Sequence, residues 1–163
     1  MYKRQDKAGY IDKTGKIVIE PKFVNAQSFS EGLACVKIDN KWGYIDKKGN
    51  IVIKPQYDWF GDFSEGLAVQ KINGVFGNKF GYIDKTGKWA IRPQFDYAED
   101  FSEGMALVKS ESECGYIDKT GKMVIKLDLK FCYGFAKSFS EGLALIVSRE
   151  DNIIKGHYML RNF

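Results

Sequence analysis

Hydrophobic and polar residues alternate over short runs along this chain, and two such runs flank a polar turn at residues 47–50. The first run contains Tyr44 and Ile45, and the second spans residues 51–53. Short β-favouring runs around a glycine-containing turn are typical of a β-hairpin, and Gly49 fits the left-handed position that a tight turn requires. Asp46 is placed to accept backbone N–H groups of that turn. The pattern therefore predicts a hairpin over residues 43–53.

This predicted hairpin is one of four copies. The segment Gly-Tyr-Ile-Asp begins at residues 9, 43, 81 and 115, so successive copies start 34, 38 and 34 residues apart. A second segment, Phe-Ser-Glu-Gly followed by Leu or Met and then Ala, begins at residues 29, 63, 101 and 139. Self-similarity at this period marks a repeat architecture. The basic unit has 34 residues, and two four-residue insertions, within 72–79 and around 127–130, are expected to lie in loops.

The rest of each unit predicts a third strand. A proline follows the second run at residues 21, 55 and 93, and we expect strand pairing to end there because proline has no N–H to donate. An aromatic-rich connection such as 57–63 has apolar residues three positions apart, which indicates a turn or a short helical loop. The Ser-Glu-Gly segment then reverses the chain into a strand such as 67–71, in which Ala68 allows close approach of a neighbouring layer.

These elements predict an all-β fold. Four tandem repeats of about 34 residues, each a three-stranded antiparallel meander, would either stack as a short β-solenoid or close as a propeller-like ring. A chain of 163 residues is expected to be a single domain. Its repeat units are approximately 8–41, 42–79, 80–113 and 114–150. Residues 151–163 are expected to form a degenerate capping segment, since 155–160 resemble the start of a fifth hairpin.

Three segments of the second unit carry a resemblance to a known family: residues 42–49, 55–58 and 63–68. Together they resemble the WG repeat family, bacterial β-rich repeats named for a Trp-Gly pair. The resemblance extends over about residues 8–147 in four tandem copies. Only the second copy keeps the tryptophan of that pair, so this side chain is not a required functional group here; the four equivalent residues are Ala8, Trp42, Phe80 and Cys114. The resemblance implies an all-β repeat fold and no common catalytic activity.

Composition narrows the class of protein. The hydrophobic fraction of 44% and the aromatic fraction of 15% are ample for a buried core, and the net charge of +4 is well short of a strongly basic nucleic-acid binder. Three cysteines, Cys35, Cys114 and Cys132, do not occupy equivalent repeat positions, so we expect thiols in a reducing compartment. Residues 1–7 precede no apolar run and no apolar segment could span a membrane. We therefore expect a cytoplasmic protein without membrane contact, which is compatible with a leader removed before residue 1.

Recurring acidic residues have structural explanations. Asp12, Asp46, Asp84 and Asp118 lack the further oxygen ligands of a calcium loop, so turn capping is the favoured role. Glu31, Glu65, Glu103 and Glu141 recur four times, whereas an active site needs one asymmetric constellation, so we expect them to accept backbone N–H groups at the glycine turns. His157 is the only histidine and no cysteine has a supporting motif. No catalytic residue, metal site or cofactor is therefore predicted.

The favoured function is a non-catalytic protein–protein interaction or scaffold module, including a small inhibitor or adaptor. This hypothesis rests on the repeat architecture and on the missing catalytic set. Residues that do not recur are the natural specificity determinants, because the recurring ones are explained by the fold. The predicted partner-binding residues are Trp59, Phe60, Val75, Phe76, Lys79, Phe80, Trp89, Lys130 and Phe131, with the tail 157–163.

Two alternatives stay beside this hypothesis. Four lysines at equivalent hairpin tips could form a row that follows a phosphate backbone, which would make the partner a nucleic acid, a nucleoprotein or another acidic molecule. An aspartate beside each lysine cancels much of that field, so a solvated row that discourages aggregation is the competing explanation. The second alternative is binding of cell-surface glycans on the aromatic hairpins. The lysines of the row are Lys13, Lys47, Lys85 and Lys119.

Overall fold

The structure is a computed structural model that describes residues 7–74, 77–128 and 135–147. These residues form sixteen β-strands in five antiparallel sheets. The expected all-β fold is confirmed. Within the described residues, no helix is long and apolar enough to cross a membrane.

Three of the sheets are complete and have four strands each, in chain order. The first consists of β3 (Asn25–Ser30), β4 (Leu33–Ile38), β5 (Lys41–Asp46) and β6 (Ile51–Tyr57). The second consists of β7 (Phe63–Ser64), β8 (Leu67–Gly74), β9 (Gly77–Asp84) and β10 (Trp89–Phe95). The third consists of β11 (Tyr97–Ala98), β12 (Ala106–Lys109), β13 (Cys114–Ile117) and β14 (Met123–Lys126).

Two half-sheets flank the complete ones. Strands β1 (Ala8–Ile11) and β2 (Ile17–Phe23) form the first, and β15 (Phe135–Ala136) and β16 (Ile146–Val147) form the last. Each complete sheet therefore straddles two sequence units. Its first two strands come from the Phe-Ser-Glu-Gly part of one unit, and its last two from the Gly-Tyr-Ile-Asp hairpin of the next.

The prediction of three-stranded meanders is wrong, because part of the aromatic connection pairs as a further strand. In β3, Ala26 pairs with Val36 and Phe29 pairs with Ala34, with a register shift between the two pairs. That irregularity places inward-facing residues three positions apart where a regular strand places them two apart. The spacing therefore resembled a helical loop.

The predicted end of pairing at proline is also wrong. Pro55 lies inside the edge strand β6, and pairing resumes beyond it, where Trp42 is opposite Tyr57. An edge strand tolerates proline at an irregularity. The bulging strand passes so close to β5 that a Cβ on Gly43 would lie 2.6 Å from the carbonyl oxygen of Ile53. The φ of Gly43 is not positive, so its backbone conformation does not require glycine. Glycine is required because no side chain fits between the two strands.

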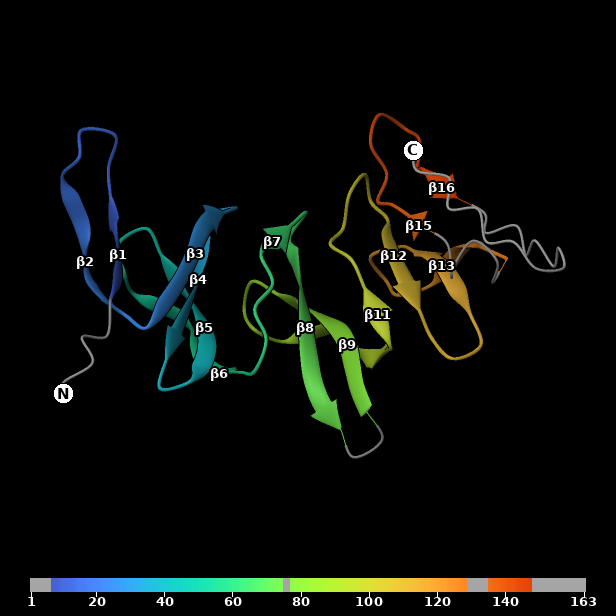
Figure 1. The fold of residues 1–163 in the computed structure, drawn as a ribbon, viewed down its shortest axis with the longest axis horizontal. Helices are drawn as coiled ribbons and strands as arrows, with labels where there is room; N and C mark the ends of the chain where they lie inside the picture. The colour runs from blue at the N-terminus through green and yellow to red at the C-terminus, as the bar shows by residue number, and fades with distance from the viewer. Residues whose placement is uncertain (1–6, 75–76, 129–134, 148–163) are drawn as a thin grey trace, which may run out of the picture.

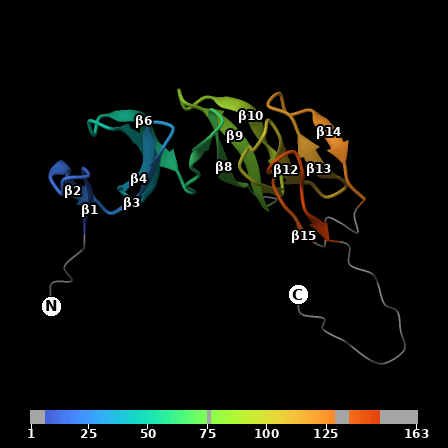
Figure 2. The same cartoon turned by 90° about the horizontal axis from the view of Figure 1, so that it is seen from above.

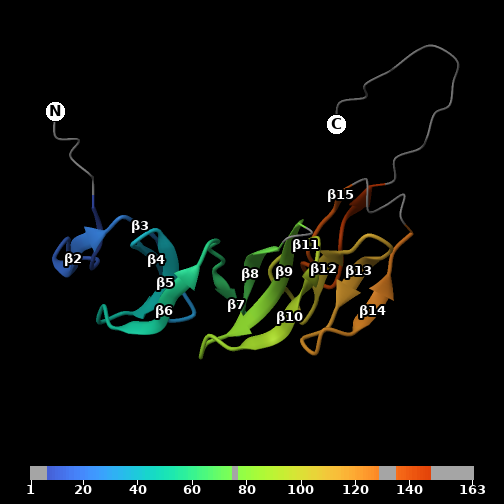
Figure 3. The same ribbon diagram turned by 90° about the horizontal axis from the view of Figure 1, so that it is seen from below.

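The sheets follow one another in an open row (Figure 1). Seen from above, the two half-sheets lie at opposite ends of that row (Figure 2), so one chain does not close the propeller-like ring that was an alternative. The edge strands β6, β10 and β14 lie along one side of the row (Figure 3).

The core lies between successive sheets. At every joint the tyrosine of Gly-Tyr-Ile-Asp packs against the phenylalanine of the next Phe-Ser-Glu-Gly segment, with ring centroids 4.8–4.9 Å apart. The Tyr44 hydroxyl also donates to the carbonyl oxygen of Gly61 at 2.6 Å. Ala34, Ala68 and Ala106 are fully buried on the opposite face, which confirms the expected close approach of a neighbouring layer. Complete sheets are therefore covered on both faces.

Two further expectations are corrected. The insertion within 72–79 lengthens a hairpin, because Asn73 pairs with Asn78 and Gly74 with Gly77 at the ends of β8 and β9. The expectation of free thiols is wrong for Cys114, which is disulfide-bonded, whereas Cys35 is a free buried thiol. The predicted cap at 151–163 and the second insertion beyond residue 128 lie outside the described residues.

Candidate interaction surfaces

The Ser-Glu-Gly segment forms a two-residue hairpin turn with unusual backbone geometry. Both turn residues are left-handed: Glu31 has φ 50° and Gly32 has φ 88°. Two positive φ angles define the turn that matches the twist of a β-hairpin, but at the first position asparagine, aspartate or glycine is the usual choice. A non-glycine residue in this region costs on the order of 1 kcal/mol. The recurrence of glutamate here therefore indicates that its side chain makes compensating contacts.

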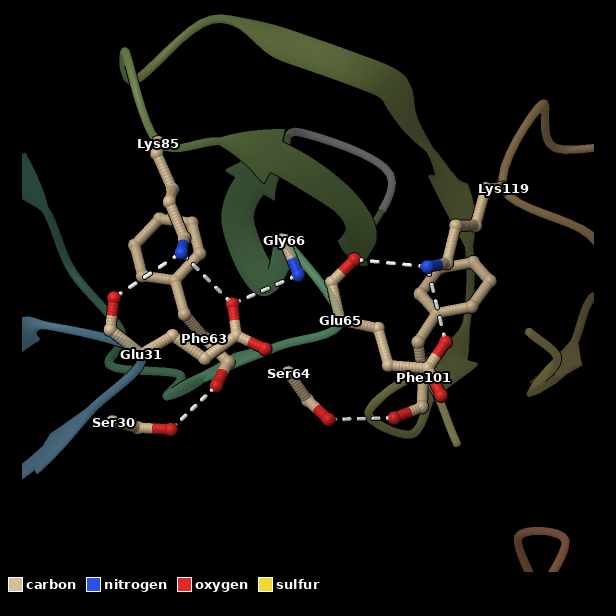
Figure 4. A network of polar contacts seen from close by, with 9 residues as sticks. All are labelled: Ser30, Glu31, Phe63, Ser64, Glu65, Gly66, Lys85, Phe101 and Lys119. Atoms are coloured by element: carbon tan, nitrogen blue, oxygen red, sulfur yellow. Dashed lines mark hydrogen bonds and ion pairs between the residues drawn. The ribbon is translucent and has the colours of Figure 1, made fainter. Parts of the chain in front are cut away.

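Those contacts join one sheet to the next (Figure 4). Oε2 of Glu31 accepts a hydrogen bond from the N–H of Gly66 at 2.9 Å and forms an ion pair with Nζ of Lys85 at 3.1 Å. Nζ of Lys85 also donates to the carbonyl oxygen of Glu31 at 3.1 Å. Beside this, Oγ of Ser30 donates to the carbonyl oxygen of Phe63 at 2.6 Å.

The same contacts recur one sheet further on. Glu65 accepts from the N–H of Gly104 at 2.9 Å and pairs with Lys119 at 3.1 Å. Glu103 accepts from the N–H of Gly142 at 2.8 Å. We call this set the inter-sheet ladder; its described members are Ser30, Ser64, Ser102, Glu31, Glu65, Glu103, Lys85 and Lys119. The expected acceptance of N–H groups at the glycine turns is confirmed for Glu31, Glu65 and Glu103, with the donor supplied by the following sheet.

The ladder makes stability depend on pH. Burial opposes ionisation of Glu65, but the bonds from Lys119 and from the N–H of Gly104 outweigh it and hold the pKa of this carboxyl below its usual value of 4.5. A carboxyl whose pKa is lowered by folding stabilises the protein above the unfolded-state pKa and loses that contribution as the pH falls through the folded-state pKa.

We therefore expect Glu65→Gln to lower the free energy of unfolding by ~1 kcal/mol at pH 7. The difference from the unmutated chain should shrink as the pH falls below 4.5, the usual value for this group. Urea denaturation at pH 7 and at ~pH 3 measures both. Glu141→Gln is the matched control, because Glu141 has the same left-handed turn but no carboxylate contact with another described residue. A deficit that stayed constant with pH would contradict this assignment.

The lysine row is divided by the ladder. Lys85 and Lys119 are engaged with glutamates, whereas Lys13 and Lys47 form no hydrogen bond or ion pair with another residue in the described ranges. The neighbouring aspartates cap turns as expected, since Oδ1 of Asp46 accepts from the N–H groups of Lys48 at 2.8 Å and Asn50 at 2.9 Å. Two of the four lysines therefore have a structural task.

Aromatic side chains that do not recur gather at the joint between the first two complete sheets. Trp59 and Phe60, in the loop before β7, stack with ring centroids 5.7 Å apart. Phe60 contacts Trp42 of β5 at 4.9 Å, and Trp59 contacts Phe80 of β9 at 6.4 Å. We call Trp42, Trp59, Phe60 and Phe80 the aromatic cluster. Trp42 and Phe80 occupy the same repeat position, which is Ala8 and Cys114 elsewhere, so this cluster forms at one joint.

The cluster reaches the surface. Trp59 is 40% exposed and Phe60 is 37% exposed, although both are large apolar side chains. Nζ of Lys71 lies 4.8 Å from the centre of the Trp59 ring, within the range of a cation–π interaction. A rigid ring pair with a lysine over one ring can bind an apolar side chain while the lysine attracts an acidic neighbour.

The remaining predicted partner-binding residues are spread over other places. Lys79 forms an ion pair with Asp96 at 2.6 Å. Trp89 lies on β10 and lines a shallow hollow of about 610 Å³ together with Ile72, Lys88, Arg92 and Pro93. Val75, Phe76, Lys130 and Phe131 lie outside the described residues. The structure thus brings Trp59, Phe60 and Phe80 together and leaves Trp89 separate.

The described part of the chain contains no group of three or more His, Cys, Asp or Glu side chains that could hold a metal ion. Burial raises the pKa of the Cys35 thiol to about 12, so this cysteine is a protonated core residue. The sequence did not reveal the ladder lysines, although a signal exists: Lys85 and Lys119 each lie 54 residues beyond the glutamate that they contact.

Comparison with known proteins agrees with this architecture. The family model described as the WG containing repeat matches four segments, residues 9–42, 42–76, 80–113 and 115–148. No curated protein and no solved structure matches the chain. The four matches cover most of the chain and coincide with the four sequence units, so this protein belongs to the family of the WG containing repeat.

Proposed function

We propose that this protein is a non-catalytic module that binds another protein through the aromatic cluster. One observation carries the proposal. The side chains that recur in each unit form the turns, the core and the inter-sheet ladder. Trp59 and Phe60 do not recur, and each keeps over a third of its side-chain surface exposed. Large exposed aromatics are typical anchors of protein interfaces.

The expected partner segment combines an apolar side chain with an acidic one. The apolar group would lie against the stacked rings of Trp59 and Phe60, and the acidic group would face Lys71. Binding should therefore be weakened by salt only in part, because the apolar contact is insensitive to screening.

A tagged pull-down from lysate of the source cell tests the proposal. The lysate is treated with nuclease and washed at ~0.1 M and ~0.5 M salt, and recovered proteins are quantified for the unmutated chain and for Trp59→Ala. We expect a specific protein that survives nuclease and high salt and whose recovery falls at least ~10-fold with Trp59→Ala, as for an interface anchor.

Tyr97→Ala is the matched control. Tyr97 is 42% exposed, lies four residues before Phe101 as Trp59 lies four residues before Phe63, and has Lys109 over its ring at 5.5 Å. It therefore shares the setting of Trp59 without a second ring stacked on it in the described part of the chain. Equal recovery with Trp59→Ala and the unmutated chain, in variants with unchanged thermal unfolding, would place the binding surface elsewhere.

Nucleic-acid binding along the lysine row is the weaker candidate. Lys85 and Lys119 are held by glutamates, which leaves two of the four positive charges for a phosphate backbone. In the same experiment it predicts recovery of nucleic acid that disappears at ~0.5 M salt. No contact among the residues that the structure describes favours the glycan alternative over the protein partner.

A further inference from the structure

The two ends of the row carry the two complementary halves of one sheet. In the first complete sheet, β4 pairs with β5 through six residue pairs, and in the third, β12 pairs with β13 through four. By position in the repeat, β16 is the counterpart of β4, and β1 is the counterpart of β5. Neither has that neighbour within the described residues, since β1 pairs with β2 and β16 with β15.

The side chains of both half-sheets are correspondingly exposed. Ile11 of β1 is 67% exposed, whereas its counterparts Ile45 and Ile83 are 0% exposed. In the last half-sheet, Leu145 is 62% exposed against 1% for its counterpart Leu107. Ile146 is 42% exposed against 0% for its counterpart Val108. Apolar residues that fill the core of a complete sheet are thus left in solvent at the two ends.

The backbone of β16 is also directed for pairing. The N–H of Lys137 donates to the carbonyl oxygen of Leu145 at 3.0 Å, so the backbone groups of Leu145 face β15. Successive residues of a strand direct their N–H and C=O groups to opposite sides. Those of Ile146 therefore face the free edge, where they can pair with another strand.

The inter-sheet ladder has open positions at the same two ends. A ladder lysine contacts a glutamate of the preceding sheet, as Lys85 contacts Glu31. Lys13 and Lys47 have no such contact within the described residues, because no glutamate turn precedes their sheets in this chain. At the other end, Glu103 holds Gly142 but has no ladder lysine, and Glu141 has neither contact among the described residues. Within the described ranges, two lysines without a ladder glutamate at the start thus match two glutamates without a ladder lysine at the end.

We propose that the last half-sheet of one copy pairs with the first half-sheet of a second copy, completing a four-stranded sheet at a head-to-tail junction. By the register of β12 and β13, Ala144, Leu145, Ile146 and Val147 lie opposite Ile11, Tyr10, Gly9 and Ala8 of the second copy. Glu103 and Glu141 then pair with Lys13 and Lys47 of the second copy.

The occupant is a second copy because the two half-sheets of one chain lie at opposite ends of the row and cannot reach each other (Figure 1). Every contact at the junction has a counterpart within the chain, either the pairing of two strands in a sheet or a ladder contact between two sheets. Such a head-to-tail contact is heterologous, so the products are short chains of molecules or closed rings. The last strand pair is also short, and an isolated two-stranded hairpin is marginal alone, so the junction stabilises both ends.

Light scattering after size exclusion tests this junction with two charge-reversed variants of the full chain. One carries Lys13→Glu and Lys47→Glu, and the other carries Glu103→Lys and Glu141→Lys. The unmutated chain should show a mass that rises with concentration above the 18.6 kDa of one copy. Each variant alone should associate at least tenfold more weakly. Their equimolar mixture should associate again and grow with concentration, because both junctions between unlike variants place opposite charges together, whereas junctions between like variants place equal charges together.

Ile146→Pro supplies an independent test, since it removes an N–H that faces the free edge and spares the bond between Lys137 and Leu145. It should abolish association while circular dichroism and thermal unfolding of the monomer change little. The proposal is overturned if the unmutated chain stays at one copy at every concentration, as expected if residues 151–163 of the same chain cover β16. It is equally overturned if the charge-reversed mixture fails to associate or if Ile146→Pro associates like the unmutated chain.

Discussion

Gly81→Ala should be among the most destabilising single-methyl changes in this protein, lowering the free energy of unfolding by at least ~3 kcal/mol. A Cβ at this position would lie 2.6 Å from both the carbonyl oxygen of Ile91 and the nitrogen of Pro93. Both are backbone atoms of the edge strand β10, which cannot rotate away as a side chain can. We therefore expect the added methyl group to push β9 and β10 apart at this point. Urea denaturation measures the resulting decrease in the free energy of unfolding.

Gly66→Ala is the control for this prediction. Gly66 has φ +88°, and a Cβ there would meet nothing within 4 Å. Alanine at this turn therefore carries only the cost of the left-handed backbone, ~1 kcal/mol. Equal losses for the two variants would contradict the claim that the close approach of two strands requires glycine in the Gly-Tyr-Ile-Asp segment.

Tyr82→Ala should cost ~3–5 kcal/mol, the range for removing a fully buried aromatic side chain. Tyr82 is 0% exposed, packs on Phe101 of the next sheet at 4.8 Å, and donates from its hydroxyl to the carbonyl oxygen of Glu99 at 2.7 Å. Because each sheet contacts only its neighbours, the loss should weaken hydrogen-exchange protection in both adjoining sheets.

Tyr10→Ala is the matched variant at the end of the row. Tyr10 makes the same contacts, a ring distance of 4.8 Å to Phe29 and a hydroxyl bond of 2.8 Å to the carbonyl oxygen of Gln27, but it lies in a half-sheet and is only partly buried. We expect a cost of ~2 kcal/mol or less, since less surface is buried there. If Tyr10→Ala destabilised the chain as much as Tyr82→Ala, the joints could not be ranked by burial.

Local features of the fold could be predicted from the sequence. The hairpin expected over residues 43–53 is present in β5 and β6, with Gly49 at φ 84° in the turn, and the strand expected at 67–71 lies within β8. These elements follow from alternation and turn chemistry, which act over a few residues. The repeat period predicted the number of units, and the motif residues 42–49, 55–58 and 63–68 carried the resemblance to the family.

The fourth strand of each sheet could not be predicted in the same way. Its pairing in β3 is interrupted by a register shift, and β7 has only two residues, Phe63 and Ser64. Neither leaves an alternating pattern in the sequence. Without this strand the contacts between successive sheets could not be predicted either, because the glutamates of the inter-sheet ladder lie in the turn that follows it.

The candidate site was predicted only in part. The absence of repetition singled out Trp59, Phe60 and Phe80 as partner-binding residues, and the structure brings the three into one cluster, whereas their binding of a partner stays a prediction. Trp42 belongs to the same cluster, although the sequence excluded it as a required functional group. Whether an aromatic side chain is exposed depends on packing between two sheets, which no single segment determines.

The central claim is that recurring residues build the row of sheets and that the aromatic cluster with the exposed side chains Trp59 and Phe60 binds a protein. The most direct test is to measure the affinity of the recovered partner for Trp59→Ala and Glu65→Gln at a temperature where both variants are folded. We predict at least ~10-fold weaker binding for Trp59→Ala and unchanged binding for Glu65→Gln. Unchanged binding for Trp59→Ala, or a loss confined to Glu65→Gln, would contradict the account and assign recognition to the repeated ladder.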